Sequence, residues 1–212
     1  MDSNIGAKER VTQKRLIGLF QDVLEYDYLG NWEYRESNSN VEETLLRRYL
    51  KRRKYADKEI DKAVAKFKQA AANIGAGLYN ANREVYTLLR YGVNVQSDVS
   101  EYKKTVHLID WTNPMENDFQ IAEEVTVQGK SDRRPDLVVY VNGIAVAVIE
   151  LKRSTVSVHE GIRQNIRNQQ DEYIPRFFTT VQLLCAGNDT EGLHYGVIKT
   201  PEKFWLRWKE PC

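Results

Sequence analysis

Long apolar runs, cysteine and histidine are all scarce in this 212-residue sequence. No apolar run approaches the roughly 18 residues of a membrane span, and the first residues lack the charged and apolar regions of a signal peptide. The two cysteines, Cys185 and Cys212, and the three histidines, His107, His159 and His194, have no metal-ligand spacing. We therefore expect a reduced, cytoplasmic protein without a membrane segment, a disulfide or a zinc site.

An excess of charge of one sign is also missing. The formal net charge is +1, which argues against a uniformly basic coat for nucleic acid. Basic residues do cluster locally, in a run made of Arg47, Arg48, Lys51, Arg52, Arg53 and Lys54 and in the pair Arg133 and Arg134. We interpret the run as a solvated helix face, with phosphate binding as the alternative, and we predict that the pair contacts phosphates.

The most informative stretch is a predicted β-hairpin. Two runs rich in valine and isoleucine, 137–141 and 144–149, flank Asn142-Gly143, a strong signal for a tight turn. Positions of both parities are apolar in these runs apart from Tyr140. We therefore expect both faces of the hairpin to be covered, as in a central sheet with helices packed on it.

Polar residues gather at the open end of this hairpin. Asp136 begins the first strand, and Glu150 and Lys152 end the second strand on one shared face. A strict two-residue turn would place Asp136 opposite Ile149, on the other face. We therefore predict a three-residue loop with a bulge at Gly143, which moves Asp136 to the face of Glu150.

This combination of side chains predicts metal-dependent hydrolysis. Two converging carboxylates repel each other unless one is protonated or a cation lies between them, and Mg²⁺ prefers such oxygen ligands. We expect Asp136 and Glu150 to bind one Mg²⁺ ion or two, with the carbonyl of Leu151 as a further ligand and Mn²⁺ as a substitute. Lys152 would orient the attacking water or neutralise a phosphate. The alternative is a surface ion pair.

The remaining periodicity sets the expected fold. It predicts helices at 8–25, 40–53, 57–74, 79–91 and 158–172, a loop at 27–40, and strands at 93–96, 105–110, 119–128, 181–186 and 194–200. This order predicts an α/β fold with a mixed β-sheet flanked by helices and an N-terminal helical extension. We place the helical region at 1–77 and the core at 78–212, within one compact unit.

One motif is a false signal. Gly129-Lys130-Ser131 resembles the end of a P-loop, but residue 124 is glutamate where a glycine is required, and no helix pattern follows. We expect no nucleotide binding here, so any use of ATP would belong to domains outside this chain.

Several blocks together resemble the N-terminal nuclease domain of the restriction (motor) subunit of type I restriction enzymes, in the PD-(D/E)xK superfamily. The blocks are 78–86, 108–111, 117–119, 134–136, 150–152, 160–165 and 186–189, within a similarity over roughly 40–210. The resemblance implies a restriction-endonuclease fold and Mg²⁺-dependent cleavage of double-stranded DNA, with Asp136 and Glu150 as metal ligands and Lys152 as the catalytic lysine. It also implies ATP-driven motor domains after this one, and methylation and specificity subunits as partners. The chain is therefore expected to be an excised nuclease domain.

The sequence departs from this family in its Gln-x-x-x-Tyr motif, which is thought to hold DNA or orient the catalytic groups. Gln164 stands at the expected distance from Lys152, but Asn168 replaces the tyrosine. A second match, Gln169 with Tyr173, has both residues of the motif but begins five residues further along the chain. We expect Gln164 at the functional position and Tyr173 in packing.

An acidic residue on an early helix often faces the metal in this fold. Glu42 and Glu43 are the candidates, with helix capping as the alternative, and Glu84 is a weaker one. The rival to a nuclease is a catalytically silent, nuclease-like scaffold that docks the motor subunit to DNA or to partner subunits.

Overall fold

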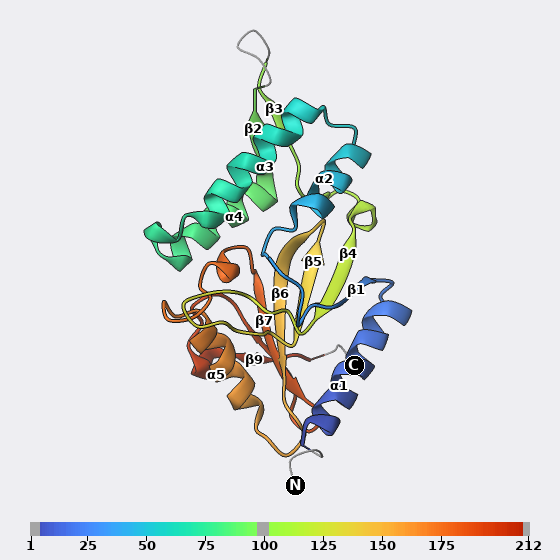
Figure 1. Cartoon of the computed structure of the whole chain (residues 1–212), viewed down its shortest axis with the longest axis vertical. Helices are drawn as coiled ribbons and strands as arrows, with labels where there is room; N and C mark the ends of the chain where they lie inside the picture. The colour runs from blue at the N-terminus through green and yellow to red at the C-terminus, as the bar shows by residue number, and fades with distance from the viewer. Residues whose placement is uncertain (1–4, 97–101, 210–212) are drawn as a thin grey trace.

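The computed structural model describes residues 5–96 and 102–209, and it confirms the predicted α/β fold with a mixed sheet flanked by helices (Figure 1). The helices are α1 (Ile5–Asp22), α2 (Glu43–Arg52), α3 (Asp57–Ala72), α4 (Leu78–Tyr91) and α5 (Val158–Asn168). The strands are β1 (Asp27–Asn31), β2 (Val93–Val95), β3 (Lys104–Val106), β4 (Phe119–Glu123), β5 (Leu137–Val141), β6 (Ile144–Leu151), β7 (Leu183–Asn188), β8 (Gly192–Gly196) and β9 (Leu206–Arg207). Short 3-10 helices lie at Ile74–Ala76, Pro114–Glu116, Phe177–Thr179 and Glu202–Phe204. None of the described helices is long and apolar enough to cross a membrane.

The main sheet has seven strands in the order β1-β4-β5-β6-β7-β8-β9. The β1–β4 and β6–β7 pairs are parallel, and the other neighbours are antiparallel. Helix α5 packs on one face, where Ile162 meets Val138 and Val148, while Ile17 of α1 packs on the opposite face. The central hairpin is therefore covered on both sides, as its uninterrupted apolar pattern predicts.

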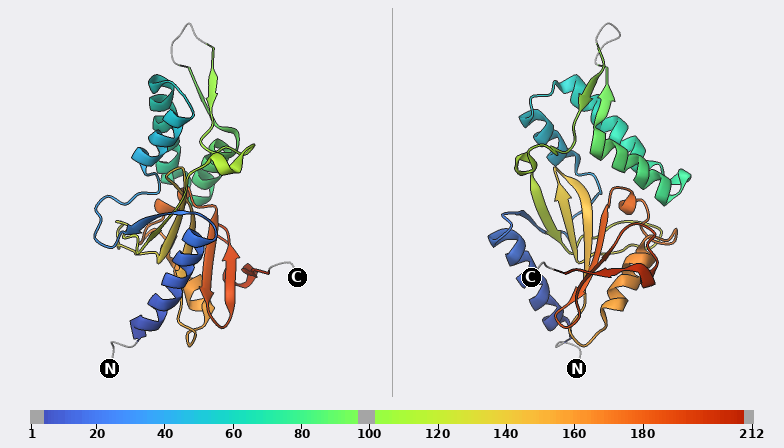
Figure 2. Two further views of the ribbon diagram at one scale, coloured as in Figure 1. Left: turned by 90° about the vertical axis from the view of Figure 1, so that its right-hand side faces the viewer. Right: turned by 180° about the vertical axis from the view of Figure 1, so that it is seen from behind.

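A helical lobe, formed by α2, α3 and α4 with the β2–β3 hairpin, stands above the turn end of the β5–β6 hairpin (Figures 1 and 2). Its core contains Leu46, Tyr49, Phe67 and Val85 and joins the sheet at Ile144. The segments at 93–96 and 105–110 were expected in the main sheet, but β2 and β3 instead form a separate two-stranded sheet. The division of the chain at residue 77 stays a prediction.

Two strands lie outside the sequence-based prediction. Strand β1 falls in the expected loop 27–40 and runs parallel to β4 at one edge of the sheet, and β9 forms the other edge. The sequence of β1, Asp-Tyr-Leu-Gly-Asn, has no regular alternation and contains a glycine. The hydrogen-bonding edge of β4, a long-range feature, makes this segment a strand, and short-range periodicity does not reveal it.

The hairpin register corrects the predicted bulge. Asn142 and Gly143 have φ angles of 53° and 79°, so the turn has two residues with left-handed backbone, and Val141 pairs with Ile144. The irregularity lies inside the strands: Tyr140 pairs with Ala145 but Val139 pairs with Ala147. Val146 is thus the extra residue of a β-bulge, and the loop bulge predicted at Gly143 is wrong.

The bulge at Val146 has the effect that the predicted loop bulge was meant to supply. Beyond it Leu137 pairs with Ile149, so the next position along places Asp136 opposite Glu150. Both residues follow the parity of Val138 and Val148 and therefore belong to the α5 face.

Candidate active site at the open end of the hairpin

The backbone of Leu151 joins two of the predicted site residues. Its amide donates a hydrogen bond of 2.6 Å to Oδ2 of Asp136, and its carbonyl accepts one of 2.9 Å from Nζ of Lys152. The amide of Lys152 donates to the carbonyl of Gly187 on the adjacent β7, at 2.9 Å, which fixes the strand end in the sheet. The acid that precedes β5 and the lysine that follows β6 thus meet at one residue.

Glu150 lies beneath this point and is completely buried. Helix α5 supplies two amide donors to its carboxyl group: Nε2 of Gln164 lies 2.7 Å from Oε2, and Nδ2 of Asn168 lies 3.4 Å from Oε1. Burial raises the pKa of Glu150 well above its usual range, the neighbouring Asp136 carboxylate raises it further, and Lys152 opposes the shift. Both effects disfavour a second negative charge beside Asp136, and a bound cation would oppose them.

The two glutamine frames differ clearly. Gln164 faces Glu150, as expected from its distance to Lys152, whereas Gln169 donates to the carbonyl of Asn165 and accepts from the amide of Lys199. Gln169 is therefore tied into the protein interior. Tyr173 packs beneath the guanidinium of Arg133, whose carbon lies 3.9 Å from the ring centre, in agreement with the expected packing role.

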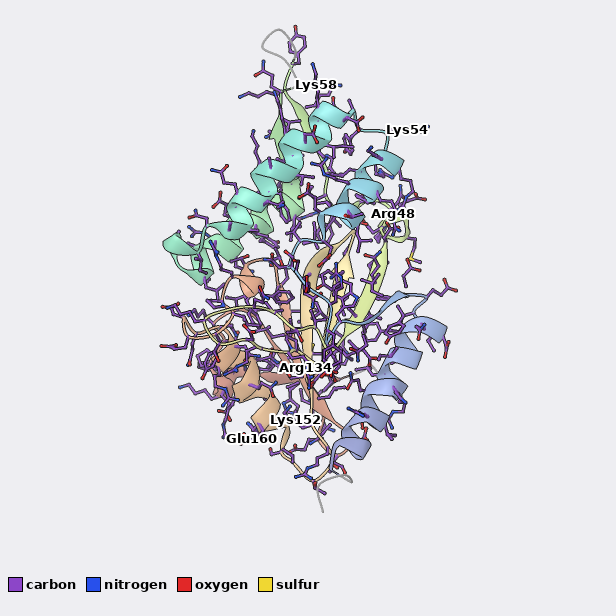
Figure 3. The ribbon with its side chains drawn as sticks, in the orientation of Figure 1. Arg48, Lys54, Lys58, Arg134, Lys152 and Glu160 are labelled. Atoms are coloured by element: carbon purple, nitrogen blue, oxygen red, sulfur yellow. The ribbon has the colours of Figure 1, made fainter. Side chains whose placement is uncertain are left out.

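A cleft with a volume of about 680 Å³ opens above these groups. It is lined by Arg10, Gln13, Lys14, Asn31, Glu33, Glu123, Glu124, Arg134, Asp136, Lys152 and Gln164. Figure 3 shows Arg134 and Lys152 near the lower ends of the central strands, far from Arg48 and Lys54 in the helical lobe. The structure thus brings Arg134, Asp136, Lys152 and Gln164 to one cleft.

The predicted arginine pair is split. Arg134 lines the cleft, but its Nε lies 2.8 Å from Oε2 of Glu124 and it also pairs with Glu33. Arg133 does not line the cleft; it stacks on Tyr173 and donates to the carbonyl of Asp132. The carboxylates around Arg134 compensate its charge, which weakens the predicted phosphate contact.

Gln13 of α1 was not expected from the sequence. It is 4% exposed, and its Nε2 lies 3.0 Å from Oε2 of Glu123 and 3.1 Å from Oε1 of Glu124. Gln13 precedes Leu16 and Ile17 by three and four positions, so it belongs to the buried stripe of its helix. A polar residue in an apolar stripe is the signal that could have identified it.

The early-helix acids do not reach the site. The backbone amide of Glu42 donates to the carbonyl of Gly143 at 2.8 Å, so Glu42 lies at the turn end of the hairpin, opposite to Asp136. Its carboxylate pairs with Arg35 at 2.6 Å and accepts from the amide of Ser39 at 3.0 Å, while Glu43 starts α2. Glu84 is exposed on α4. A metal-facing role for these three residues is wrong. Glu42 directly precedes α2, but its carboxylate makes no capping hydrogen bond to the helix and accepts from Ser39 instead, so the structure does not confirm the capping alternative.

The basic run at 47–54 also belongs to the helical lobe. Its members pair with nearby carboxylates: Arg47 with Asp61 at 2.6 Å, Arg52 with Asp118 at 2.6 Å and Arg53 with Asp110 at 2.8 Å. This agrees with a solvated helix face that makes surface ion pairs.

The donor set at the open end of the hairpin fits a hard divalent cation. It offers two carboxylates in contact, one of them fully buried, and the carbonyl of Leu151 beside them. Within 5–96 and 102–209, no group of three or more histidine, cysteine, aspartate or glutamate side chains is placed to hold a metal. A site with only two carboxylates suits Mg²⁺, which keeps several water ligands, better than zinc.

Comparison with known proteins adds the family. The family model described as type I restriction enzyme R protein N terminus matches residues 6–203. The chain is 29% identical over 186 residues to the type I restriction enzyme MjaIXP endonuclease subunit of Methanocaldococcus jannaschii, which covers 83% of this chain and 17% of that protein. It is 27% identical over 114 residues to the SsaAORF53P endonuclease subunit of Staphylococcus saprophyticus, and this alignment covers 54% of this chain and 12% of that protein. It is 24% identical over 111 residues to the EcoprrI endonuclease subunit of Escherichia coli, and this alignment covers 50% of this chain and 36% of that protein.

Proposed function

The chain belongs to the family of type I restriction enzyme R protein N termini, and from this premise we propose that it is a metal-dependent endonuclease domain that hydrolyses DNA phosphodiester bonds. The observation that carries the proposal is the meeting of Asp136, Glu150 and Lys152 around Leu151. Two carboxylates and a lysine in this arrangement are the groups that phosphodiester hydrolysis needs.

The proposed ligands of Mg²⁺, or of Mn²⁺ in its place, are the carboxylates of Asp136 and Glu150 and the carbonyl of Leu151. The bound ion supplies a positive charge that stabilises the charge developing on the attacked phosphate. The amide groups of Gln164 and Asn168 donate to both oxygens of Glu150, which favours its ionised, metal-binding form.

Lys152 acts on the water and on the phosphate. Its ammonium group is held at the Leu151 carbonyl, beside the two carboxylates, and it lines the cleft. From there it orients the attacking water for in-line displacement and neutralises a phosphate oxygen. Because the chemistry engages the DNA backbone, this domain needs no contact with base edges.

The wider setting is also part of the proposal. The three relatives above are endonuclease subunits, and the alignments cover only 12% to 36% of their length. We propose that double-stranded DNA is the substrate in the cytoplasm, that ATP is used by motor domains outside this chain, and that methylation and specificity subunits are partners that recognise the site.

Metal binding tests this function directly, because cutting by such a domain can depend on the rest of the complex. We expect Mn²⁺ titrations followed by calorimetry to show binding to the wild-type chain, loss of binding in Asp136→Ala, and unchanged binding in the control Asp171→Ala, whose exposed carboxylate lies outside the cleft. Equal titration curves for the wild type and Asp136→Ala would reject the nuclease and favour the silent scaffold.

A further inference from the structure

Helix α1 forms a wall of the candidate active site, although more than a hundred residues separate it from the hairpin. Ile17 packs on the sheet face opposite to α5, among Leu137, Val139 and Ile149. The helix runs beside the lower half of the sheet (Figure 1). Its residues Arg10, Gln13 and Lys14 line the same cleft as Asp136 and Lys152.

Polar contacts fix the orientation of α1 at two points. Gln13 donates to Glu123 and Glu124, and its amide also lies 3.5 Å from the carbonyl of Asp136. On the neighbouring side of the helix, Oγ1 of Thr12 donates to Oδ2 of Asp189 at 2.8 Å, and Arg15 pairs with the same carboxylate. The helix therefore presents a defined edge to the cleft.

That edge carries two exposed cations. Arg10 and Lys14 are separated by one helical turn, about 6 Å along the helix axis. Both are exposed, and neither makes an ion pair within the described part of the chain. Arg134, by contrast, is held by Glu33 and Glu124. Apart from Lys152 at the proposed reaction centre, the positive charge that the cleft offers to an incoming polyanion therefore comes from α1.

Carboxylates that line the cleft would repel DNA, so binding of DNA needs positive charge nearby. Glu123 accepts hydrogen bonds from Gln13 and from the hydroxyl of Tyr28, the latter at 2.7 Å, and both Glu123 and Glu124 line the cleft. A DNA strand that approaches Asp136 must pass these carboxylates. Cations beside its path lower the electrostatic barrier by neutralising phosphates.

We propose that α1 is a backbone clamp, in which Arg10 and Lys14 bind DNA phosphates next to the scissile one. The position of the scissile phosphate rests on the function proposed above. The contacts are independent of sequence, because they reach only the backbone.

Salt-dependent DNA binding tests the clamp. Anisotropy of a labelled duplex would be measured in EDTA between about 50 and 200 mM KCl, the range in which phosphate contacts dominate binding. We expect Arg10→Ala/Lys14→Ala to bind the duplex more weakly. The salt slope, which is the magnitude of the slope of the logarithm of the binding constant against the logarithm of the salt concentration, should be smaller by about 1.8, roughly 0.9 for each lost phosphate contact. The control Arg83→Ala/Lys66→Ala removes the same charge from α4 and α3 outside the cleft and should keep the wild-type slope.

The outcomes separate the clamp from the metal site. Three results would overturn the clamp. They are an unchanged salt slope in Arg10→Ala/Lys14→Ala, an equal decrease of the slope in the control variant, and no duplex binding by the wild-type chain. Mn²⁺ binding by Arg10→Ala/Lys14→Ala should match the wild type, while Asp136→Ala should lose Mn²⁺ and keep the DNA salt slope. Thermal melts of each variant confirm that it is folded.

Discussion

The side-chain amide of Gln164 donates a hydrogen bond of 2.7 Å to the fully buried carboxyl group of Glu150. This contact joins helix α5 to the candidate active site at the open end of the hairpin. It also distinguishes Gln164 from Gln169, whose side chain bonds to Asn165 and Lys199 instead. Asn168, one turn further along α5, adds a second donor to the same group.

The Gln164 contact predicts a selective effect on metal affinity. Gln164→Ala should weaken Mn²⁺ binding by roughly 10- to 100-fold, because partners of metal ligands typically contribute that much. Gln169→Ala should leave Mn²⁺ binding unchanged but lower the free energy of unfolding by about 1 to 3 kcal/mol, since it removes buried hydrogen bonds to Asn165 and Lys199. Calorimetric titration and urea denaturation measure the two quantities; the reverse pattern would place the functional frame at Gln169.

Glu150 predicts a stability that falls as pH rises in the absence of metal. Its pKa is raised in the folded state, mainly by burial, so the folded protein binds more protons than the unfolded chain above the ordinary glutamate pKa. The free energy of unfolding therefore decreases as pH rises from about 4.5, where the unfolded glutamate titrates. Glu150→Gln removes this titration and should be more stable than the wild type at pH 8 in EDTA, with a smaller advantage at pH 5.

Thermal melts at both pH values check this, with Glu160→Gln on the exposed part of α5 as the control. A stability advantage of Glu150→Gln that shrinks with rising pH would contradict the assignment of the titration to this residue. Added Mn²⁺ should stabilise the wild type and not Glu150→Gln.

Glu59 predicts the opposite pH dependence in the helical lobe. Its carboxylate lies 2.6 Å from Nζ of Lys104 and accepts from the amide of Ala56 at 3.0 Å, and both contacts lower its pKa. Its contribution is present above the pKa of the unfolded glutamate and is lost as pH falls. Because Lys104 is largely exposed, Glu59→Gln should cost only about 1 kcal/mol at pH 7. The difference from the wild type, measured by urea denaturation, should shrink as pH falls below the ordinary glutamate pKa; a constant difference would point to packing instead.

The contacts of Gln13 predict how much the attachment of α1 to the sheet contributes to the free energy of unfolding. Gln13→Ala removes hydrogen bonds to the half-buried carboxylates of Glu123 and Glu124 and should lower the free energy of unfolding by about 1 to 3 kcal/mol. Gln13→Glu has nearly the same shape but adds a carboxylate facing two others, so it should be more damaging. Urea denaturation measures both, with Gln21→Ala on the exposed end of α1 as the control. Equal effects of the two substitutions would show that the site is solvated.

Local sequence signals were sufficient for the hairpin and its three polar residues. The Asn-Gly turn and the unbroken apolar pattern depend on neighbouring residues, and Asp136, Glu150 and Lys152 stand out as charges beside buried strands. The bulge at Val146, by contrast, depends on how β6 packs between β5 and β7, so no short window of sequence contains it.

The contribution of α1 was hidden for a similar reason. Sequence periodicity showed a helix, but it could not show that this helix reaches the end of strands more than a hundred residues away. The acidic residue expected on an early helix was sought on α2, which the structure places at the other end of the hairpin. The helix that borders the cleft carries a glutamine at its buried position instead.

The hydrogen bond from the Leu151 amide to Asp136 makes one backbone proton a reporter of the whole centre. A ligand drawn to the aspartate must alter the electron density around that nitrogen. The nitrogen-15 resonance of a single peptide group can therefore report occupancy in the isotopically labelled protein, without any substitution or attached probe in the cleft.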